Sequence, residues 1–325
     1  MSGFAIELTP DGRGRRVDPS AACAERSGDA RFIWVHLDAR EQDTLGWLKA
    51  HGHVPETVVY ALTATETRPR SDAIAPGALV NLRGPAAEQQ AEEADDPLVS
   101  IRCWLEKGRA ITVAFRTLAG LDDLTANMEA GRIHDPGDLV SQLAVAITKR
   151  VDPVIADLGD LVDDCETALD PKRAFETRRK IAGARSAAIV YRRFVAPQRE
   201  ALARLAELEV DWLEEDDRLH LREAADRFAR MTEELESIRE RSALIHEQLT
   251  DLRSELIENR ALLLSIVALI FLPLTFLTGL LGMNVEGIPF AHRPWAFGAV
   301  CGVCVLIAFA ISGWFARAHW FRRDS

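Results

Sequence analysis

The spacing of hydrophobic and polar residues changes twice along the chain and divides it into three parts. In the first part, up to about residue 135, short β-branched or aromatic runs are bounded by polar turns, which is typical of strands. Asp38 and Pro55 are placed to begin helices that run to about residues 50 and 64. We therefore expect a mixed α/β region, with strands at 32–37, 78–82, 98–105 and 110–115.

The second part, from about residue 138, has a helical pattern. One helical region is predicted at 138–169 with Pro153 as a break, and another at 174–195, ending near Pro197. No Pro or Gly then occurs before Pro273, and globular helices are rarely so long. We expect a helix from about residue 216 to 281, roughly 100 Å in length at 1.5 Å per residue.

This long helix carries a heptad repeat. Its apolar positions alternate in steps of three and four, as helices packed side by side require, while most other positions are charged. A helix of this length needs neighbours, so the pattern favours oligomerisation. One seam position is formed by Phe228, Leu235, Ser242, Leu249, Leu256 and Leu263, and the other by Met231, Ile238, Ile245, Leu252 and Asn259.

The third part contains two uncharged apolar runs, residues 261–281 and 295–315. Each is long enough to cross a hydrocarbon core of about 30 Å as a helix. The link between them, residues 282–294, is too polar for lipid, so its backbone must face water or line a water-filled path. The expected organisation is an α+β cytosolic domain at 1–135, a helical region with a long stalk helix at 136–259, and a transmembrane hairpin at 260–325.

Charge decides the orientation and excludes one class of partner. Arginines precede the first apolar run and follow the second, which places both termini in the cytoplasm and the link outside. The first thirty residues lack the apolar core of a signal peptide, so we expect the hairpin to anchor the chain in the bilayer. The net charge of −11 argues against a nucleic-acid partner. The five cysteines show no framework spacing, which favours a reduced cytosolic domain.

The sequence lacks the common enzyme signatures: it has no Walker loop, HExxH, GxSxG or GxGxxG. His51 and His53 form an HxH pair, and Cys301 and Cys304 a CxxC pair inside an apolar run, but neither pair alone makes a strong metal site. The acidic runs 157–170 and 207–217 contain no base. They could be solvated helix faces or, repeated around an oligomer, could concentrate cations near a pore.

The first apolar run has features that an anchor does not need. Small and hydroxylic residues gather toward its end, and Pro273 removes a helix hydrogen bond. Small residues allow close helix packing in lipid, but their position just before Gly282-Met283-Asn284 favours a pore lining. Hydroxyl and amide oxygens suit a hydrated divalent cation. A membrane-anchored coiled-coil scaffold is the rival hypothesis, and it does not account for these residues.

Several segments resemble a known family. Residues 271–284 (FLPLTFLTGLLGMN) resemble the signature of the CorA metal ion transporter superfamily, in which a GMN tripeptide ends the first of two C-terminal membrane helices. Residues 282–289 (GMNVEGIP), 66–70 (ETRPR) and 34–38 (WVHLD) are similar to the ZntB zinc-transporter branch. Glu286 departs from that branch, which has Gly there, and is closer to the magnesium branch.

The resemblance implies a funnel-shaped homopentamer of CorA type. It implies that Gly282, Met283 and Asn284 form the selectivity filter, with Asn284 contacting the hydrated metal ion, and that Glu286 attracts cations to the loop. It implies Zn²⁺ uptake across the inner membrane with possible proton coupling, or alternatively a Mg²⁺ or Co²⁺ channel gated by cytosolic metal. The ion is cargo, and no cofactor is expected. The expected pore-lining residues are Thr275, Leu272, Gly279, Ala268, Leu264 and Ala261.

Overall fold

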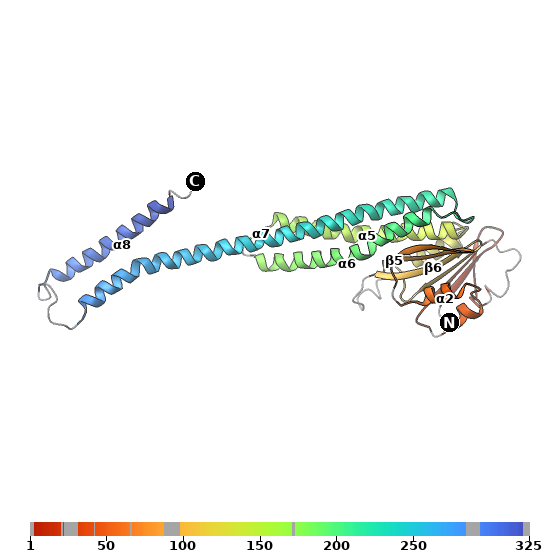
Figure 1. Ribbon diagram of the computed structural model, residues 1–325, viewed down its shortest axis with the longest axis horizontal. Coiled ribbons are helices and arrows are strands. Elements are labelled where there is room, and N and C mark those ends of the chain that lie inside the picture. Colours follow the sequence, from red (N-terminus) through yellow and green to blue (C-terminus); the bar gives the residue numbers. More distant parts are fainter. Residues whose placement is uncertain are drawn as a thin grey trace. The chain divides into compact units, whose positions relative to one another are not determined.

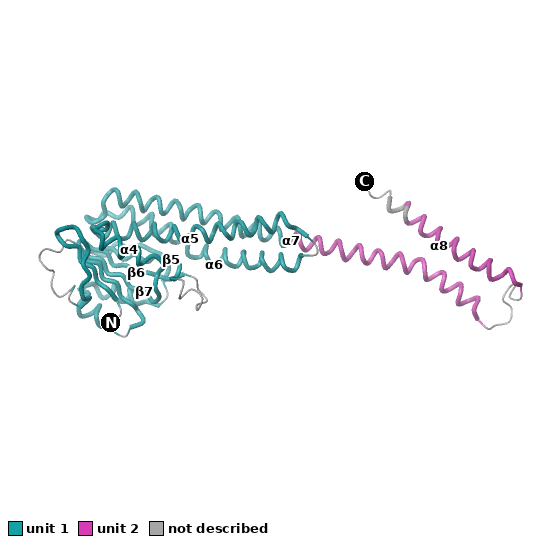
Figure 2. Tube along the Cα trace, turned by 180° about the vertical axis from the view of Figure 1, so that it is seen from behind, with its two compact units in different colours: residues 1–246 teal, residues 247–325 magenta. Residues whose placement is uncertain are grey.

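The computed structural model describes residues 3–20, 22, 32–41, 43–65, 67–87, 98–170, 173–283 and 293–320. The chain divides into two compact units, Met1–His246 and Glu247–Ser325 (Figure 2). Each unit is described by itself below. The division at residues 135 and 259 stays a prediction.

The first unit is built on a seven-stranded sheet of the described strands, in the order β2-β1-β3-β7-β6-β5-β4. β3 pairs with β7 in parallel, and the other neighbours are antiparallel. The four predicted strands are confirmed as β3, β5, β6 and β7. The bounds are β1 Gly3–Leu8, β2 Gly14–Val17, β3 Phe32–Asp38, β4 Arg70–Ile74, β5 Gly77–Pro85, β6 Leu98–Glu106 and β7 Arg109–Ala114.

Helices cover this sheet. α1 (Asp43–Ala50) and α2 (Glu56–Thr63) contact each other, and α2 packs on β6 and β7. α4 (Leu121–Glu129) packs against β1 and β2. The start of α2 after Pro55 is confirmed. The helix expected to begin at Asp38 instead begins at Asp43, because the Asp38 carboxylate accepts the backbone N–H of Arg40 and pairs with its guanidinium at 2.6 Å.

Two prolines expected to interrupt helices do not. α5 (Pro136–Thr167) continues through Pro153, and α6 (Ala174–Ala206) continues through Pro197. An internal proline removes one hydrogen bond and strains the helix locally, but most helical stability in a protein comes from packing of the apolar face. Both helices pack on the sheet and on each other, and Val151, Ile155, Val195 and Ala201 around the prolines are buried.

The region without Pro or Gly does contain a break. α6 ends at Ala206 and α7 (Glu215–Leu281) begins after a connection of eight residues, so the acidic run 207–217 lies largely in that connection. Trp212 and Leu213 are each 5% exposed and anchor this connection in the core. Asp217 accepts the backbone N–H of Glu214 at 3.1 Å and so caps the start of α7. The uninterrupted helix expected from about residue 216 to 281 is confirmed.

In the first unit the heptad seam of α7 packs against helices of the same chain. In the first unit α7 runs side by side with α5 and α6 (Figures 1 and 2). Arg241 of α7 pairs with Asp163 of α5, and Glu236 of α7 lies 2.8 Å from Arg192 of α6. In the first unit the seam therefore does not require other copies of the chain as neighbours. The seam residues buried in the first unit are Phe228, Met231, Leu235, Ile238, Ser242 and Ile245, each at most 2% exposed.

Candidate functional site

The second unit holds two helices that are long and apolar enough to cross a membrane. They are the apolar end of α7, which stops at Leu281, and the Ala296–Phe315 part of α8 (Ala296–Trp320). The end at Leu281 agrees with the first predicted run, and Ala296–Phe315 agrees to within one residue with the second, predicted at 295–315. The start of the first span at residue 261 stays a prediction.

Each of the two helices has one partly buried stripe. The stripes recur at steps of three and four residues, as one face of a helix does. Both lie in the same compact unit, and we infer that they are the sides on which the hairpin packs. The stripe on α7 is Ile266, Ile270, Pro273, Leu274, Leu277 and Leu281, and that on α8 is Ala296, Val300, Cys304, Ile307, Ala308, Ile311 and Phe315.

The expected pore-lining residues lie on the opposite side of α7. At 3.6 residues per turn they fall within an arc of about 80°, centred roughly opposite the partly buried stripe. All of them are exposed in this single chain, and Leu264 and Leu272 are 73% and 76% exposed. The face that contains Ala261, Leu264, Ala268, Leu272, Thr275 and Gly279 is therefore available to line a path formed with other copies of α7.

The hydroxyl groups on this helix donate to its own backbone. Thr275 Oγ1 donates to the carbonyl of Phe271 at 2.8 Å, and Thr278 Oγ1 donates to that of Leu274 at 2.9 Å. Each hydroxyl proton is thus used within the helix, and the oxygen lone pairs remain to accept hydrogen bonds. Water bound to a cation donates outward, so Thr275 on the exposed face is suited to hold the shell of a hydrated ion.

The GMN tripeptide begins where α7 ends. The Gly282 N–H donates to the Thr278 carbonyl at 2.9 Å, and a Cβ at Gly282 would lie 2.9 Å from the same oxygen. A side chain at this position would force the backbone to shift, so glycine suits the end of α7. Met283 follows and is 50% exposed. Asn284 and Glu286 lie outside the described residues, so their roles stay predictions.

The two acidic runs belong to opposite ends of the helical bundle in the first unit. Asp163 and Glu166 of the first run both pair with Arg241 of α7. Asp217 of the second run lies at the other end, near Ser141. The 24-residue separation of Asp217 and Arg241 on one helix corresponds to about 36 Å. The two acidic runs are therefore separate features, and a role of either run in concentrating cations stays a prediction.

Asp217 is an unusual carboxyl group, being only 4% exposed. Burial raises its pKa to about 6, and the nearby Asp135, Asp138 and Glu214 carboxylates push in the same direction. Since the folded state then binds the proton more tightly than the unfolded chain, this group favours folding most below its ordinary pKa. That contribution disappears as the pH rises through about 6.

We expect Asp217→Asn to raise the stability of the protein at pH 8 by about 1–2 kcal/mol, with little change at pH 4.5. The amide keeps an oxygen that can accept the Glu214 N–H but carries no charge. Thermal unfolding at the two pH values measures the effect. Asp216→Asn is the matched control, because the Asp216 side chain is 80% exposed. An equal change in stability for the two variants would contradict the raised pKa of Asp217.

Other candidate metal ligands are not brought together. Among the described residues, no group of three or more His, Cys, Asp or Glu side chains could hold a metal ion. Cys301 is exposed and Cys304 half-buried on α8, and the four described cysteines are free thiols. Sequence reasoning missed one arrangement, a cavity lined by arginines from five separate segments, which no local motif indicates.

The fold and the hairpin define a membrane protein in which an α+β domain and a long helix precede two terminal spans. Residues 29–317 match the family described as CorA-like Mg²⁺ transporter protein, and the chain belongs to this family of divalent cation transporters. The resemblance read from the GMN segment is thereby confirmed. Transport accounts for the pore features, and the scaffold hypothesis is set aside.

The chain is also similar to individual members of this family and to solved structures. The chain is 31% identical to the zinc transport protein ZntB of Pectobacterium atrosepticum, over 88% of this chain and 87% of that one. It is 30% identical to ZntB of Yersinia enterocolitica, over 98% and 95% of the two chains. Among solved structures, full-length CmaX has a TM-score of 0.78 and 31% identity over 98% of both chains. The CorA magnesium transporter of Methanocaldococcus jannaschii has a TM-score of 0.78 at 17% identity, covers 98% of both chains, and shows the same fold.

Proposed function

We propose that this protein carries Zn²⁺ into the cytoplasm across the inner membrane, as a homopentamer with both termini cytoplasmic. The observation that carries the proposal is the exposed face of α7, which ends in Gly282-Met283-Asn284 and lies opposite the stripe used by the hairpin. The names of the zinc transport proteins, at about 30% identity over most of the chain, support zinc as the cargo.

The proposed path keeps the ion hydrated. Five copies of Asn284 would ring the outer mouth, and their amide oxygens would accept hydrogen bonds from the water shell. Thr275 would repeat this function further along the helix, since its proton is already donated to Phe271. Leu272 and Leu264 would form apolar constrictions that close the path by dewetting. The protein's role is then transport alone, without a resident cofactor or an enzymatic step.

The domain roles follow from this path. Residues 1–135 and 136–259 would form the cytosolic funnel, and residues 260–325 the transmembrane hairpin with its outer loop at 282–294. The exposed apolar surface of α7 supports an assembly of several copies, because Leu256, Leu263 and Leu264 continue the helix without cover from this chain.

Flux into proteoliposomes tests the proposal. Purified protein is reconstituted, and uptake of Zn²⁺, Mg²⁺, Co²⁺ and Ni²⁺ is measured with and without a pH gradient. We expect Zn²⁺ uptake that exceeds the uptake of the other ions. A response to the pH gradient supports proton coupling, and an equal rate without the gradient supports a channel. Absence of flux for every ion would refute the transport function.

A second candidate is a Mg²⁺ or Co²⁺ channel gated by cytosolic metal. Glu286 favours it, because a carboxylate follows the GMN tripeptide where the zinc-type pattern has glycine. An exposed carboxylate near the mouth raises the local cation concentration without selecting among divalent ions. Faster flux of Mg²⁺ than of Zn²⁺ in the same proteoliposomes would favour this candidate.

We expect Glu286→Gly to weaken cation capture at low concentration, with the maximal rate little changed. Removing one charge per copy lowers the local cation concentration, and the loss should shrink at high salt because screening sets in over about 8 Å at physiological ionic strength. The measurement is the concentration dependence of uptake at two salt concentrations. Glu286→Asp is the control that keeps the charge. An unaltered apparent affinity in the glycine variant would leave Glu286 without this role.

A further inference from the structure

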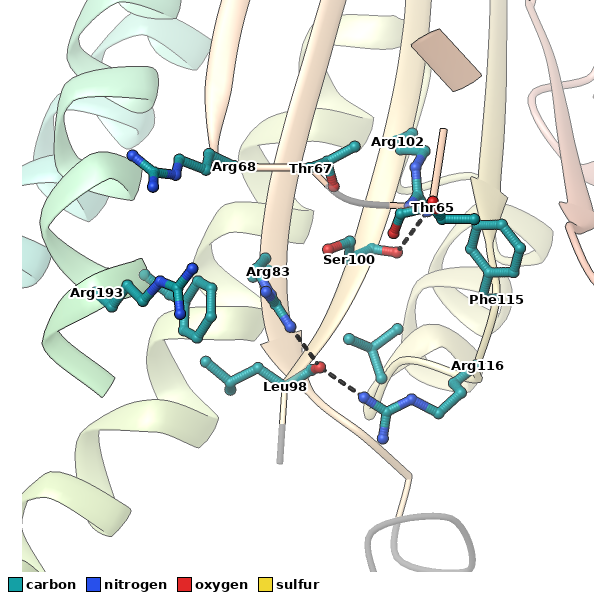
Figure 3. A pocket seen from close by; sticks show the side chains of 12 residues that line it. Thr65, Thr67, Arg68, Arg83, Leu98, Ser100, Arg102, Phe115, Arg116 and Arg193 are labelled. Carbon is teal, nitrogen blue, oxygen red and sulfur yellow. Dashed lines mark hydrogen bonds between the residues drawn. The ribbon is translucent and has the colours of Figure 1, made fainter. Parts of the chain in front are cut away.

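A cavity of about 580 Å³ in the first unit is lined by five arginines (Figure 3). Its walls come from β5, β6, the residues after β7, the segment between α2 and β4, and helix α6. No carboxylate is among the described residues that line it. The five arginines are Arg68, Arg83, Arg102, Arg116 and Arg193.

Strand register explains why these side chains meet. Arg83 of β5 pairs directly with Ser100 of β6, so both project from the same face of the sheet. Arg102 lies two residues further along β6 and therefore shares that face. Arg83 lies 17 residues before Ser100 in the sequence, and the antiparallel pairing of β5 and β6 brings it beside Ser100 and Arg102.

Two of the guanidinium groups converge on one neutral oxygen. The Leu98 carbonyl accepts from Arg83 Nη2 at 2.9 Å and from Arg116 Nη2 at 2.7 Å (Figure 3). The cavity also offers aromatic surfaces to these cations. The Arg83 guanidinium lies 3.8 Å from the centre of the Phe194 ring, and that of Arg102 lies 4.9 Å from the centre of the Phe115 ring. Arg83, Arg102 and Arg116 are thus held in place before any ligand arrives.

Arg102 forms the floor of the cavity and is 1% exposed. Its Nη2 donates to the Ala64 carbonyl at 2.6 Å, but its Nε has no hydrogen-bond partner among the described atoms. Burial, with Arg83 nearby, lowers the pKa of Arg102 to about 10. A buried charged donor without a partner is costly, so a negative charge placed beside Arg102 would stabilise this site.

We propose that this cavity binds a small solute with a chain of phosphates, such as a di- or triphosphate. Guanidinium groups match phosphate oxygens in paired hydrogen bonds, and several converging arginines suit a ligand with several negative charges. The Thr65, Thr67 and Ser100 hydroxyls at the wall can donate to further oxygens. The volume falls in the range of small-molecule sites, about 300–1,000 Å³. This site lies in the first unit and does not depend on the proposed transport function.

Binding is measured by calorimetry on the full-length protein in detergent, in metal-free buffer so that the phosphates do not chelate cargo ions. The probes are inorganic triphosphate and adenosine triphosphate, with sulfate at matched ionic strength as the reference anion. We expect saturable binding of triphosphate that sulfate does not reproduce. Similar affinity for both probes identifies the phosphate chain as the recognised group, and tighter binding of the nucleotide adds a nucleoside contact. Absence of binding for both would overturn the proposal.

Variants locate the site. Arg68→Gln with Arg193→Gln removes two exposed cations of the rim, so the fold should be kept. Arg185→Gln with Arg199→Gln removes two exposed α6 arginines outside the cavity and is matched in charge. We expect binding about tenfold weaker or more for the rim pair, and a change within about twofold for the control pair. Equal losses of affinity in the two double variants would overturn the proposed site, because general charge attraction would then explain the binding.

Acidic side chains of the chain itself could occupy the arginine cavity instead of a phosphate ligand. A third variant tests this alternative. Glu92, Glu93, Asp95 and Asp96 lie between β5 and β6, outside the described residues. Replacing all four by amides should leave triphosphate binding in place or tighten it. Binding that appears only in this variant, with none in the native protein, would overturn the proposal in favour of a cavity filled by the chain itself.

Discussion

Replacement of Asn284 by Ala is expected to abolish selective cation uptake while leaving the oligomer assembled. The amide oxygen is proposed to accept a hydrogen bond from the water shell of the ion, and charge-assisted hydrogen bonds are worth about 1.5–3 kcal/mol. Loss of one such bond lowers flux by about tenfold or more, and a homopentamer loses it in every copy. The measurement is uptake of Zn²⁺ and Mg²⁺ into proteoliposomes, with size-exclusion chromatography to confirm assembly.

The control for this experiment is Cys301→Ser. Cys301 is exposed on α8, away from the partly buried stripe of that helix, and its replacement should leave flux unchanged. Asn284→Ala with native rates and native selectivity would contradict the filter assignment. It would not by itself remove Thr275 from the proposed path, because Thr275 lies nine residues earlier in the sequence and within α7.

Leu235→Ala is expected to destabilise the first unit strongly, by about 3 kcal/mol. Leu235 is 0% exposed within the seam between α7 and its neighbours, and truncation leaves a cavity in a packed interior. For a unit of this size the loss corresponds to a fall of roughly 6–12 °C in melting temperature. Thermal unfolding of the full-length protein in detergent, followed by circular dichroism, measures it.

Leu256→Ala is the matched control on the same helix and in the same seam. Leu256 is 38% exposed, so the packing within one chain predicts a change of about 0.5 kcal/mol or less. A large loss at Leu235 with a small loss at Leu256 supports packing of the seam against α5 and α6. Equal losses would contradict it and would mean that neighbouring copies cover the seam along its whole length.

The strands of the sheet illustrate what can be predicted locally. β3, β5, β6 and β7 are buried almost throughout, so their side chains form apolar runs that are visible in the sequence. β2 (GRRV) and β4 (RSDAI) are the two edges of the described sheet, and Ser71 is the one buried residue in these two strands. Polar edges blunt unwanted pairing, and for that reason they lack the hydrophobic pattern by which strands are predicted.

The helices show where local signals are overridden. Pro153 and Pro197 were expected to end helices, yet α5 and α6 pass through them because packing on the sheet outweighs one lost hydrogen bond. The break after Ala206 needs neither Pro nor Gly. It depends on Trp212 and Leu213 entering the core and on Asp217 capping the next helix, and all three are tertiary contacts or caps.

The candidate pore was predictable, and its surroundings were not. Two apolar runs, the GMN tripeptide and a set of small and hydroxylic residues at helical spacing are all local, because one helix carries them. Structure added that this face lies opposite the hairpin's stripe, and that Thr275 donates its proton to the backbone. Asn284 and Glu286, which we expect to select the ion, lie outside the described residues, so their roles stay predictions.

The sequence by itself determined the two spans, the four buried strands, the long helix and the family, because each depends on composition or periodicity within one continuous segment. Only the tertiary structure decided which partners bury the heptad seam and which arginines meet in a cavity. Arg83, Arg102 and Arg193 lie on β5, β6 and α6, and no local pattern encodes their convergence. The physical reason is that side chains distant in sequence are brought together by strand pairing and helix packing, which are settled when the whole unit folds.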